Sequence, residues 1–463
     1  MPTYSGKFQY LNSNGSVQQA GPCRVAFEAE TLTLTPASGA PLALDLGDID
    51  LFLPGEYELA LTLYTGKKIL LNQFAKTFQD LCHNLLEAYR KRLLQCLLLE
   101  DLEEITRFDG FVRLESPDRT FACPAEIRLY KSNLAILPGQ ATGMQLRLAD
   151  IDAVNFDAAT WTVTIESGNQ KLVFTKLAKR TEEFNERLTT AILDLTQKGA
   201  ETIHSMFPFL SPDDFQQAAV LMKEGRAVAL PKLRSIHPMM EQALATNVVG
   251  AQLKPQFDVL LKHVPGGNYY AGFKQIRKDE DQAAGEGRSQ DSEADEDESS
   301  TLEAAGGKTA ESSGETKPGA AGTEEAEPML HWFFLPLAAK PGAGFPDNLV
   351  AWEATSHSGR ATYFFLLVPP EQAALLGDPE KGPGLLESAI QQLNRAIVLL
   401  NFRREPIYLP DGSLQLQPRF RRYAIACRKL PELVRLRSSF LGRAIHTTPE
   451  AWQKQFESFL SQV

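Results

Sequence analysis

The sequence predicts an α+β protein: two antiparallel barrels, each closed by a C-terminal helix, followed by an α+β domain with a disordered acidic insertion. Three observations predict this fold: an internal repeat, a change of hydrophobic period inside each copy, and a strongly acidic segment in the last third. The 463 residues, 43% of them apolar, suffice for about three domains, each with its own core. We expect the two copies at residues 1–100 and 105–199, the third domain at 200–278 with 329–463, and the acidic insertion at 279–328.

The internal repeat appears when the chain is shifted by 102 residues. Residues 22–66 then align with 124–168 without a gap, and Asp48-Ile49-Asp50 falls on Asp150-Ile151-Asp152. Other identical pairs are Pro22 and Pro124, Leu32 and Leu134, Leu44 and Leu146, and Gly66 and Gly168. A duplicated domain should have one strand order in both copies. It should also bury Leu44 and Leu146 at matching places, and likewise Phe74 and Leu177.

Each copy changes its hydrophobic period near its end. Alternation in Leu42-x-Leu44-x-Leu46 and in Trp161-x-Val163-x-Ile165 is typical of half-buried antiparallel strands. Apolar residues then recur at intervals of three and four, which indicates an amphipathic helix. They are Phe74, Phe78, Leu81, Leu85 and Tyr89 in copy one, and Leu177, Phe184, Leu188, Ile192 and Leu195 in copy two. Six or seven short strands followed by one helix describe an open barrel whose end the helix closes.

This order of elements, with local sequences such as 129–138 followed by 146–152, resembles the pleckstrin-homology-like superfold, including the bacterial pleckstrin-homology and GRAM-like variants. Members that bind phosphoinositides carry several cations between the first two strands. Copy one has Lys7 there, and copy two has Arg113 and Arg119 beside acidic residues. We therefore do not expect head-group recognition by the copies, because it needs several convergent cations. The resemblance implies a barrel closed by a C-terminal helix.

The repeated Asp-Ile-Asp segments could ligate a metal or form turns. Asp48, Asp50, Asp150 and Asp152 follow alternating strands, and an apolar residue stands between the two aspartates of each pair. That break in alternation indicates a bulge or turn, where aspartate side chains accept hydrogen bonds from backbone amides. We expect the turn-forming role, with Asp50 and Asp152 at strand ends and no bound cation.

The last third reads as helices with recognisable caps and four strands. Ser211-Pro212 and Thr448-Pro449 each place an N-cap residue before a proline at the first helical position. Helices are also expected near 238–245, 256–263 and 385–400, and strands at 269–276, 332–337, 349–355 and 362–368. His357 to Arg360 should close a hairpin. The acidic insertion lies between the first two strands, so we expect it to be a loop inside a hairpin.

Two segments of opposite charge stand out in this last third. The insertion holds 16 acidic and three basic residues, a net charge of -13, and its composition cannot offset the entropy of ordering. The basic stripe consists of Arg419, Arg421, Arg422, Arg428, Lys429, Arg435, Arg437 and Arg443. It could be a solvated helix face, a docking site for anionic partners, or a seat for the acidic insertion, which would then inhibit binding. Tyr423 is the only aromatic residue between Arg421 and Arg437, so stacking on single-stranded nucleic acid is not expected.

No catalytic or cofactor motif appears. The five cysteines and seven histidines lack ligand spacing, and no nucleophile elbow or dinucleotide fingerprint is present. We expect no cofactor and no metal. No apolar run is long enough to span a membrane and no secretory signal is visible, so a cytoplasmic protein is expected. The leading hypothesis is a non-catalytic binding or scaffold protein that uses its tandem copies for protein interaction. The alternatives are peripheral association with anionic membrane through the basic stripe and, third, an enzyme site in the C-terminal domain.

Overall fold

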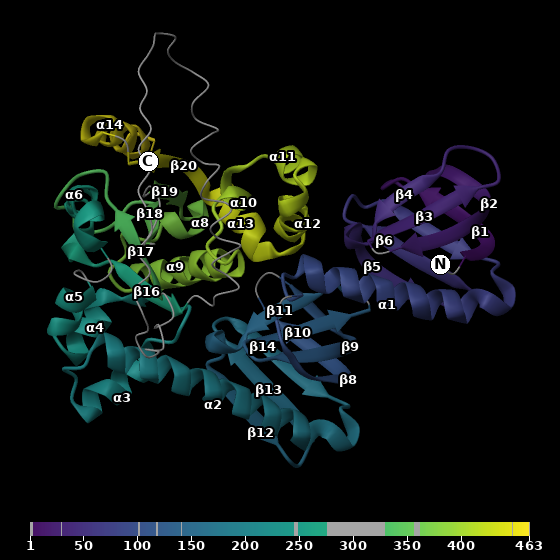
Figure 1. Cartoon of the computed structure of the whole chain (residues 1–463), viewed down its shortest axis with the longest axis horizontal. Coiled ribbons are helices and arrows are strands. Elements are labelled where there is room, and N and C mark those ends of the chain that lie inside the picture. Colours follow the sequence, from purple (N-terminus) through teal and green to yellow (C-terminus); the bar gives the residue numbers. More distant parts are fainter. Residues whose placement is uncertain are drawn as a thin grey trace, which may run out of the picture.

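The computed structural model describes residues 3–28, 30–100, 102–116, 119–139, 141–244, 249–275, 329–355, 362–446 and 448–462. They form three antiparallel sheets with helices, which confirms the α+β class (Figure 1). The acidic insertion and the hairpin at His357 to Arg360 lie outside the described residues.

Copy one forms a seven-stranded sheet in the order β4-β3-β2-β1-β7-β6-β5. Its strands are β1 (Thr3–Leu11), β2 (Val17–Glu28), β3 (Thr31–Pro36), β4 (Leu42–Asp45), β5 (Ile49–Pro54), β6 (Glu58–Leu63) and β7 (Lys68–Asn72). The helix α1 (Phe78–Cys96) follows, and it buries Phe78, Leu81, Leu85 and Tyr89 as the spacing predicts. Phe74 is also buried, but it precedes the helix, in a turn at which Gln73 and Ala75 have positive φ.

Copy two has the same strand order, β11-β10-β9-β8-β14-β13-β12, as the duplication predicts. Its strands are β8 (Glu104–Glu115), β9 (Thr120–Tyr130), β10 (Asn133–Pro138), β11 (Met144–Arg147), β12 (Ala153–Asp157), β13 (Thr162–Ser167) and β14 (Gln170–Thr175). Leu177 is buried like Phe74, and Leu146 is buried. Leu44 is only half-buried, so the expectation of matching burial fails at this one pair.

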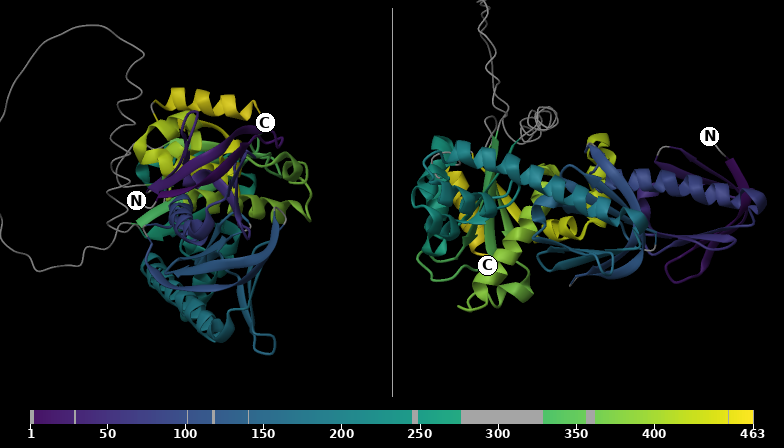
Figure 2. Two further views of the ribbon diagram at one scale, coloured as in Figure 1. Left: turned by 90° about the vertical axis from the view of Figure 1, so that its right-hand side faces the viewer. Right: turned by 90° about the horizontal axis from the view of Figure 1, so that it is seen from below.

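The helix after copy two extends past the predicted boundary at 199. α2 (Thr181–Met206) has no proline to stop it before Pro208, and Gly199 is buried within it. Its last turns belong to a different core, because Ile203 and Phe207 pack among residues of the third unit. Copy two and the third unit are therefore joined by a continuous helix, which crosses between them in Figures 1 and 2.

The third unit is a six-stranded sheet with helices on both faces. Its strands are β15 (Val228–Ala229), β16 (Tyr270–Gln275), β17 (Met329–Leu337), β18 (Leu349–Thr355), β19 (Thr362–Leu367) and β20 (Phe440–Ile445), in that spatial order. Gln275 pairs with Met329, so the acidic insertion does join two strands of one hairpin. The predicted caps are confirmed, since Ser211 and Thr448 accept hydrogen bonds from the amides of Asp214 and Ala451. Strands β15 and β20 were not predicted.

Alternation along β17 divides the third unit between two cores. Trp332 and Phe334 enter a core that continues through α9 (Gly382–Leu399), α12 (Arg421–Lys429) and α13 (Pro431–Ser439) into copy one. Phe333 and Leu335 face the opposite core, with α6 (Gly250–Leu261) and α14 (Pro449–Leu460). The other helices that the structure describes in the third unit are α3 (Pro212–Leu221), α4 (Leu230–Ile236), α5 (Met239–Leu244), α8 (Pro370–Ala373), α10 (Glu405–Tyr408) and α11 (Asp411–Leu416). Copy one and the third unit thus share one hydrophobic core.

Among the described residues, no helix is both long enough and apolar enough to cross a membrane.

Candidate functional site

Most cations of the basic stripe contact other parts of this chain. Arg437 binds Asp411 at 2.7 Å and the carbonyl oxygens of Pro406 and Leu409. Arg419 and Arg443 lie over aromatic rings, at 4.4 Å from the centroid of Phe420 and 4.2 Å from that of Tyr408. Arg435 is half-buried on α13. The other four, Arg421, Arg422, Arg428 and Lys429, lie on α12 and face copy one.

The first junction joins α12 to the Asp48-Ile49-Asp50 segment. The ammonium of Lys429, whose side chain is only 3% exposed, donates to the Ile49 carbonyl oxygen at 2.5 Å and to Asp50 at 3.0 Å. Arg428 binds Asp48 at 2.9 Å and lies over the ring of Tyr64. Burial raises the pKa of Asp48, and the Arg428 charge opposes that rise. The segment is therefore a docking point for the third unit.

The second junction repeats this chemistry at the matching segment of copy two. Lys223, which follows α3, donates its ammonium to the Ile151 carbonyl oxygen at 3.0 Å, and Arg226 lies 3.7 Å from Asp152. Burial lowers the pKa of Lys223. Two unrelated segments of the third unit thus place a lysine on the same carbonyl of each copy. Sequence reasoning missed both junctions, although the matched aspartates were a signal that both copies carry an equivalent contact.

A buried ion pair supports the second junction. Asp150 is held by Arg147 through two hydrogen bonds of 2.7 and 2.9 Å, and Arg395 of α9 lies 3.7 Å away. Burial alone would raise the pKa of Asp150, but Arg147, with Arg395, outweighs it and the pKa is lowered. The aspartate therefore stays charged inside the interface.

The expected turn-forming role holds for part of the set. Asp152 accepts a hydrogen bond of 2.7 Å from the amide of Gly168, the turn glycine of the next hairpin. In copy one a different aspartate, Asp45, caps the short 3-10 turn at Leu46–Asp48 and accepts from the Gly47 amide at 2.7 Å. Asp50 lies near the start of β5, whereas Asp48 and Asp150 each end a short 3-10 turn. Within the described ranges, no group of three or more acidic, histidine or cysteine side chains could hold a metal.

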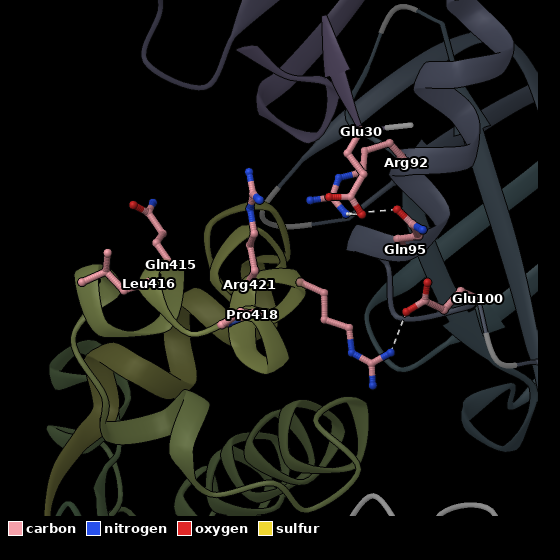
Figure 3. A pocket seen from close by; sticks show the side chains of 9 residues that line it. Glu30, Arg92, Gln95, Glu100, Gln415, Leu416, Pro418 and Arg421 are labelled. Carbon is pink, nitrogen blue, oxygen red and sulfur yellow. Dashed lines mark hydrogen bonds and ion pairs between the residues drawn. The ribbon is translucent and has the colours of Figure 1, made fainter. Parts of the chain in front are cut away.

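A cleft of about 400 Å³ opens beside the first junction, between copy one and the third unit (Figure 3). Copy one and the segment after it contribute Glu30, Arg92, Gln95 and Glu100, and the third unit contributes Gln415, Leu416, Pro418, Arg421 and Arg422. Leu416 is 84% exposed at the rim. The cleft therefore offers guanidinium groups, carboxylates, primary amides and two apolar side chains.

Two of the three arginines in the cleft are already neutralised. Arg92 binds Asp45 through two hydrogen bonds of 2.9 and 2.8 Å and also Glu30 at 2.8 Å. Arg422 binds Glu100 at 2.6 Å. Arg421 also forms an ion pair with Asp45, but its guanidinium lies 3.7 Å away, beyond hydrogen-bond distance, and its side chain is 55% exposed. In Figure 3 it extends from α12 into the open space of the cleft.

This lining is suited to binding. A carboxylate could accept two parallel hydrogen bonds from the Arg421 guanidinium, while Gln415 supplies an amide donor and acceptor and Gln95, whose oxygen accepts from Arg92 at 3.0 Å, supplies its amide N–H groups. Both carboxylates of the lining, Glu30 and Glu100, are held by arginines, so neither is set up as a general base.

A second group of polar side chains lies buried in the third unit. Glu353 of β18 is fully buried and accepts a hydrogen bond of 2.7 Å from Arg404. Burial raises its pKa to about 7, and the nearby Arg404 charge limits the rise. Tyr363, His446 and Trp452 pack ring against ring, with centroids 5.1 to 6.0 Å apart. Burial, with the Arg404 charge, lowers the pKa of His446 to about 4.

We expect Glu353 and His446 to give opposite pH dependences of stability. The pKa of Glu353 is higher in the folded than in the unfolded protein, so its contribution to the free energy of unfolding is fully present below pH 4.5. This contribution is lost as the pH rises from about 4.5 to about 7. The pKa of His446 is lower in the folded than in the unfolded protein, so its contribution to the free energy of unfolding is fully present above pH 6.5. This contribution is lost as the pH falls from about 6.5 to about 4. Each change is about 3 kcal/mol.

Urea unfolding across this pH range tests both contributions. The difference in unfolding free energy between wild type and Glu353→Gln should fall as the pH rises, and that between wild type and His446→Gln should grow. Differences that do not vary with pH would contradict the assignment.

The sequence matches no family model, and no curated protein matches it either.

Proposed function

We propose that this chain is a non-catalytic binding protein in which two pleckstrin-homology-like copies and the third unit form one scaffold. The cleft beside the first junction binds a carboxylate-bearing segment of a protein partner. The observation that carries the proposal is Arg421, the one cleft arginine that is more than half exposed and lies beyond hydrogen-bond distance of its acidic neighbour. The shared core supports the scaffold role, because it holds both walls of the cleft in fixed positions.

The side chains that line the cleft favour a peptide over an isolated small anion. A single carboxylate would use Arg421 alone, whereas a peptide can also place an apolar side chain on Leu416 and backbone groups on the two glutamines. Peripheral association with anionic membrane is the competing use of the same cations. Most of the basic stripe is engaged inside the chain, which leaves Arg421 as its most accessible member at the cleft.

Binding of a labelled hexaglutamate peptide at low salt tests this function. Arg421→Ala should weaken binding about tenfold, the loss of one charge-assisted contact. Arg187→Ala is the matched control, because Arg187 is similarly exposed, pairs with Glu183 and lies on α2 away from the cleft. Hexaglutamine should not bind.

Flotation with phosphatidylserine vesicles distinguishes peptide binding from association with anionic membrane. Vesicle binding that depends on Arg421, without binding of hexaglutamate, would assign the site to membrane. Equal peptide affinity for the wild type and Arg421→Ala would refute the proposed site.

A further inference from the structure

The two copies differ in what covers one edge of their sheets. In copy one the edge strand is β5. The backbone amide of Phe52 on this strand points away from the sheet and donates a hydrogen bond to the carbonyl oxygen of Gly139 at 3.3 Å. Gly139 lies in the turn between β10 and β11, so copy two occupies this edge of copy one. The matching edge of copy two is β12, the last strand in its sheet order.

Strand register identifies the residue of β12 that corresponds to Phe52. Phe52 pairs with Leu61, and the residue 102 positions after Leu61 is Val163, which pairs with Phe156. Phe156 is thus the counterpart of Phe52. Phe156 lies four residues after Asp152, whereas Phe52 lies two residues after Asp50, so copy two has two additional residues here.

The turn chemistry sets which groups of β12 point outward. Gly168 and Asn169 form a two-residue turn, so Ser167 and Gln170 are its closing hydrogen-bonded pair. Every second pair in an antiparallel ladder is hydrogen-bonded, so Ile165 and Val163 bond to β14. Their partners on β12, Val154 and Phe156, therefore turn their backbone amides and carbonyls away from the sheet. No backbone hydrogen bond from the rest of the described chain reaches these outward groups.

An aromatic pair stands beside this open edge. Trp161 is 49% exposed and contacts Phe156 edge to face, with centroids 6.5 Å apart. Its φ of 53° lies in the left-handed region, which is unfavourable for a bulky residue. Asp157 holds the hairpin in this conformation, because its carboxylate accepts from the Ala159 amide at 2.9 Å and from the Thr160 hydroxyl. These hydrogen bonds hold the backbone of the hairpin that carries the exposed indole.

We propose that the outer edge of β12 binds an extended segment of a partner protein, which adds a strand to the sheet of copy two. Val154 and Phe156 supply the backbone hydrogen bonds, and Trp161 packs against an apolar side chain of the segment. This site is separate from the cleft and does not depend on it.

A second copy of this chain cannot cover β12 by repeating the contact between the two copies. The face that copy two presents to copy one and the third unit includes Tyr130, Ala135 and Leu137, all buried there. The matching residues of copy one are Glu28, Thr33 and Thr35, a polar set. Copy one of a second chain therefore lacks the apolar residues with which copy two covers the edge of copy one.

Selection of random decapeptides displayed on phage against the full chain tests the proposal. Val154→Pro removes one outward amide and no bond to β13, since proline fits the extended backbone of an edge strand. Val154→Thr is the matched control with its amide intact. Enriched peptides should bind wild type and Val154→Thr equally and Val154→Pro about tenfold more weakly.

Two further measurements do not depend on the stability of the proline variant. Hydrogen exchange of the Val154 and Phe156 amides should be fast in the free chain and slow with bound peptide. Trp161→Ala should also weaken peptide binding. The proposal is overturned if no peptide is enriched, or if bound peptides protect other amides. It is also overturned if the two amides become protected as the protein alone is concentrated, because the occupant would then be a second copy.

Discussion

Replacing Arg404 with alanine is expected to lower the free energy of unfolding by about 3 kcal/mol at pH 8, and about 1 kcal/mol of this loss is absent at pH 5. The guanidinium donates to Glu353 at 2.7 Å and to the Ala354 carbonyl oxygen at 3.1 Å. Glu353 is fully buried, so without its charge partner it takes up a proton at pH 8, which costs about 1.4 kcal/mol for each pH unit above its wild-type pKa. At pH 5, below its pKa of about 7, the glutamate is protonated and the loss is confined to hydrogen bonds.

Urea unfolding followed by tryptophan fluorescence measures this effect, because Trp332 and Trp352 lie in the same sheet. The double variant Glu353→Gln with Arg404→Ala is the internal control. In the Glu353→Gln background the loss caused by Arg404→Ala should no longer depend on pH, since residue 353 can no longer titrate. An equal loss at both pH values would show that Arg404 acts through packing, for example on the Phe364 ring, and not through the charge of Glu353.

The second large effect is expected from Lys429→Met at the first junction. Methionine keeps most of the apolar length of the side chain but leaves the Ile49 carbonyl oxygen and Asp50 without the ammonium. A buried acceptor that loses its charged donor costs about 2 kcal/mol. We expect lower stability and a larger radius of gyration in small-angle scattering, because the interface between copy one and the third unit loosens.

Lys223→Met is the matched control for that experiment, since it removes the equivalent ammonium from the Ile151 carbonyl oxygen at the second junction. Lys223 is only half-buried, and copy two stays attached through α2, so its loss should leave the radius unchanged. A radius that responds equally to both substitutions, or to neither, would refute a specific role for Lys429.

Local patterns predicted the parts of the fold that depend on local chemistry. The repeat implied one strand order for both copies, and Ser211 and Thr448 were identified as caps because an N-cap acts within its own turn. The strand β20 was missed because Gly442 and Arg443 interrupt its apolar residues and extend the preceding basic stripe. Only its pairing with β19, far away in sequence, makes it a strand.

The candidate site could not be predicted for the same reason. The stripe was identified as a set of cations, but Lys429 finds its partners 379 and 380 residues earlier in the chain. No local pattern distinguishes a cation that will be buried against a carbonyl from one that will remain exposed. Arg421 and Lys429 occupy the same short helix and differ in exposure only because copy one covers one end of it more fully.

The continuous helix α2 has a mechanical consequence. Its 26 residues span about 39 Å without a break, so it acts as a lever between copy two and the third unit. A force or torque applied to copy two reaches the core around Ile203 and Phe207 directly, since the helix runs unbroken between them. A chain cut at residue 199 would lose these two anchors, so copy two and the third unit are expected to unfold as one cooperative body.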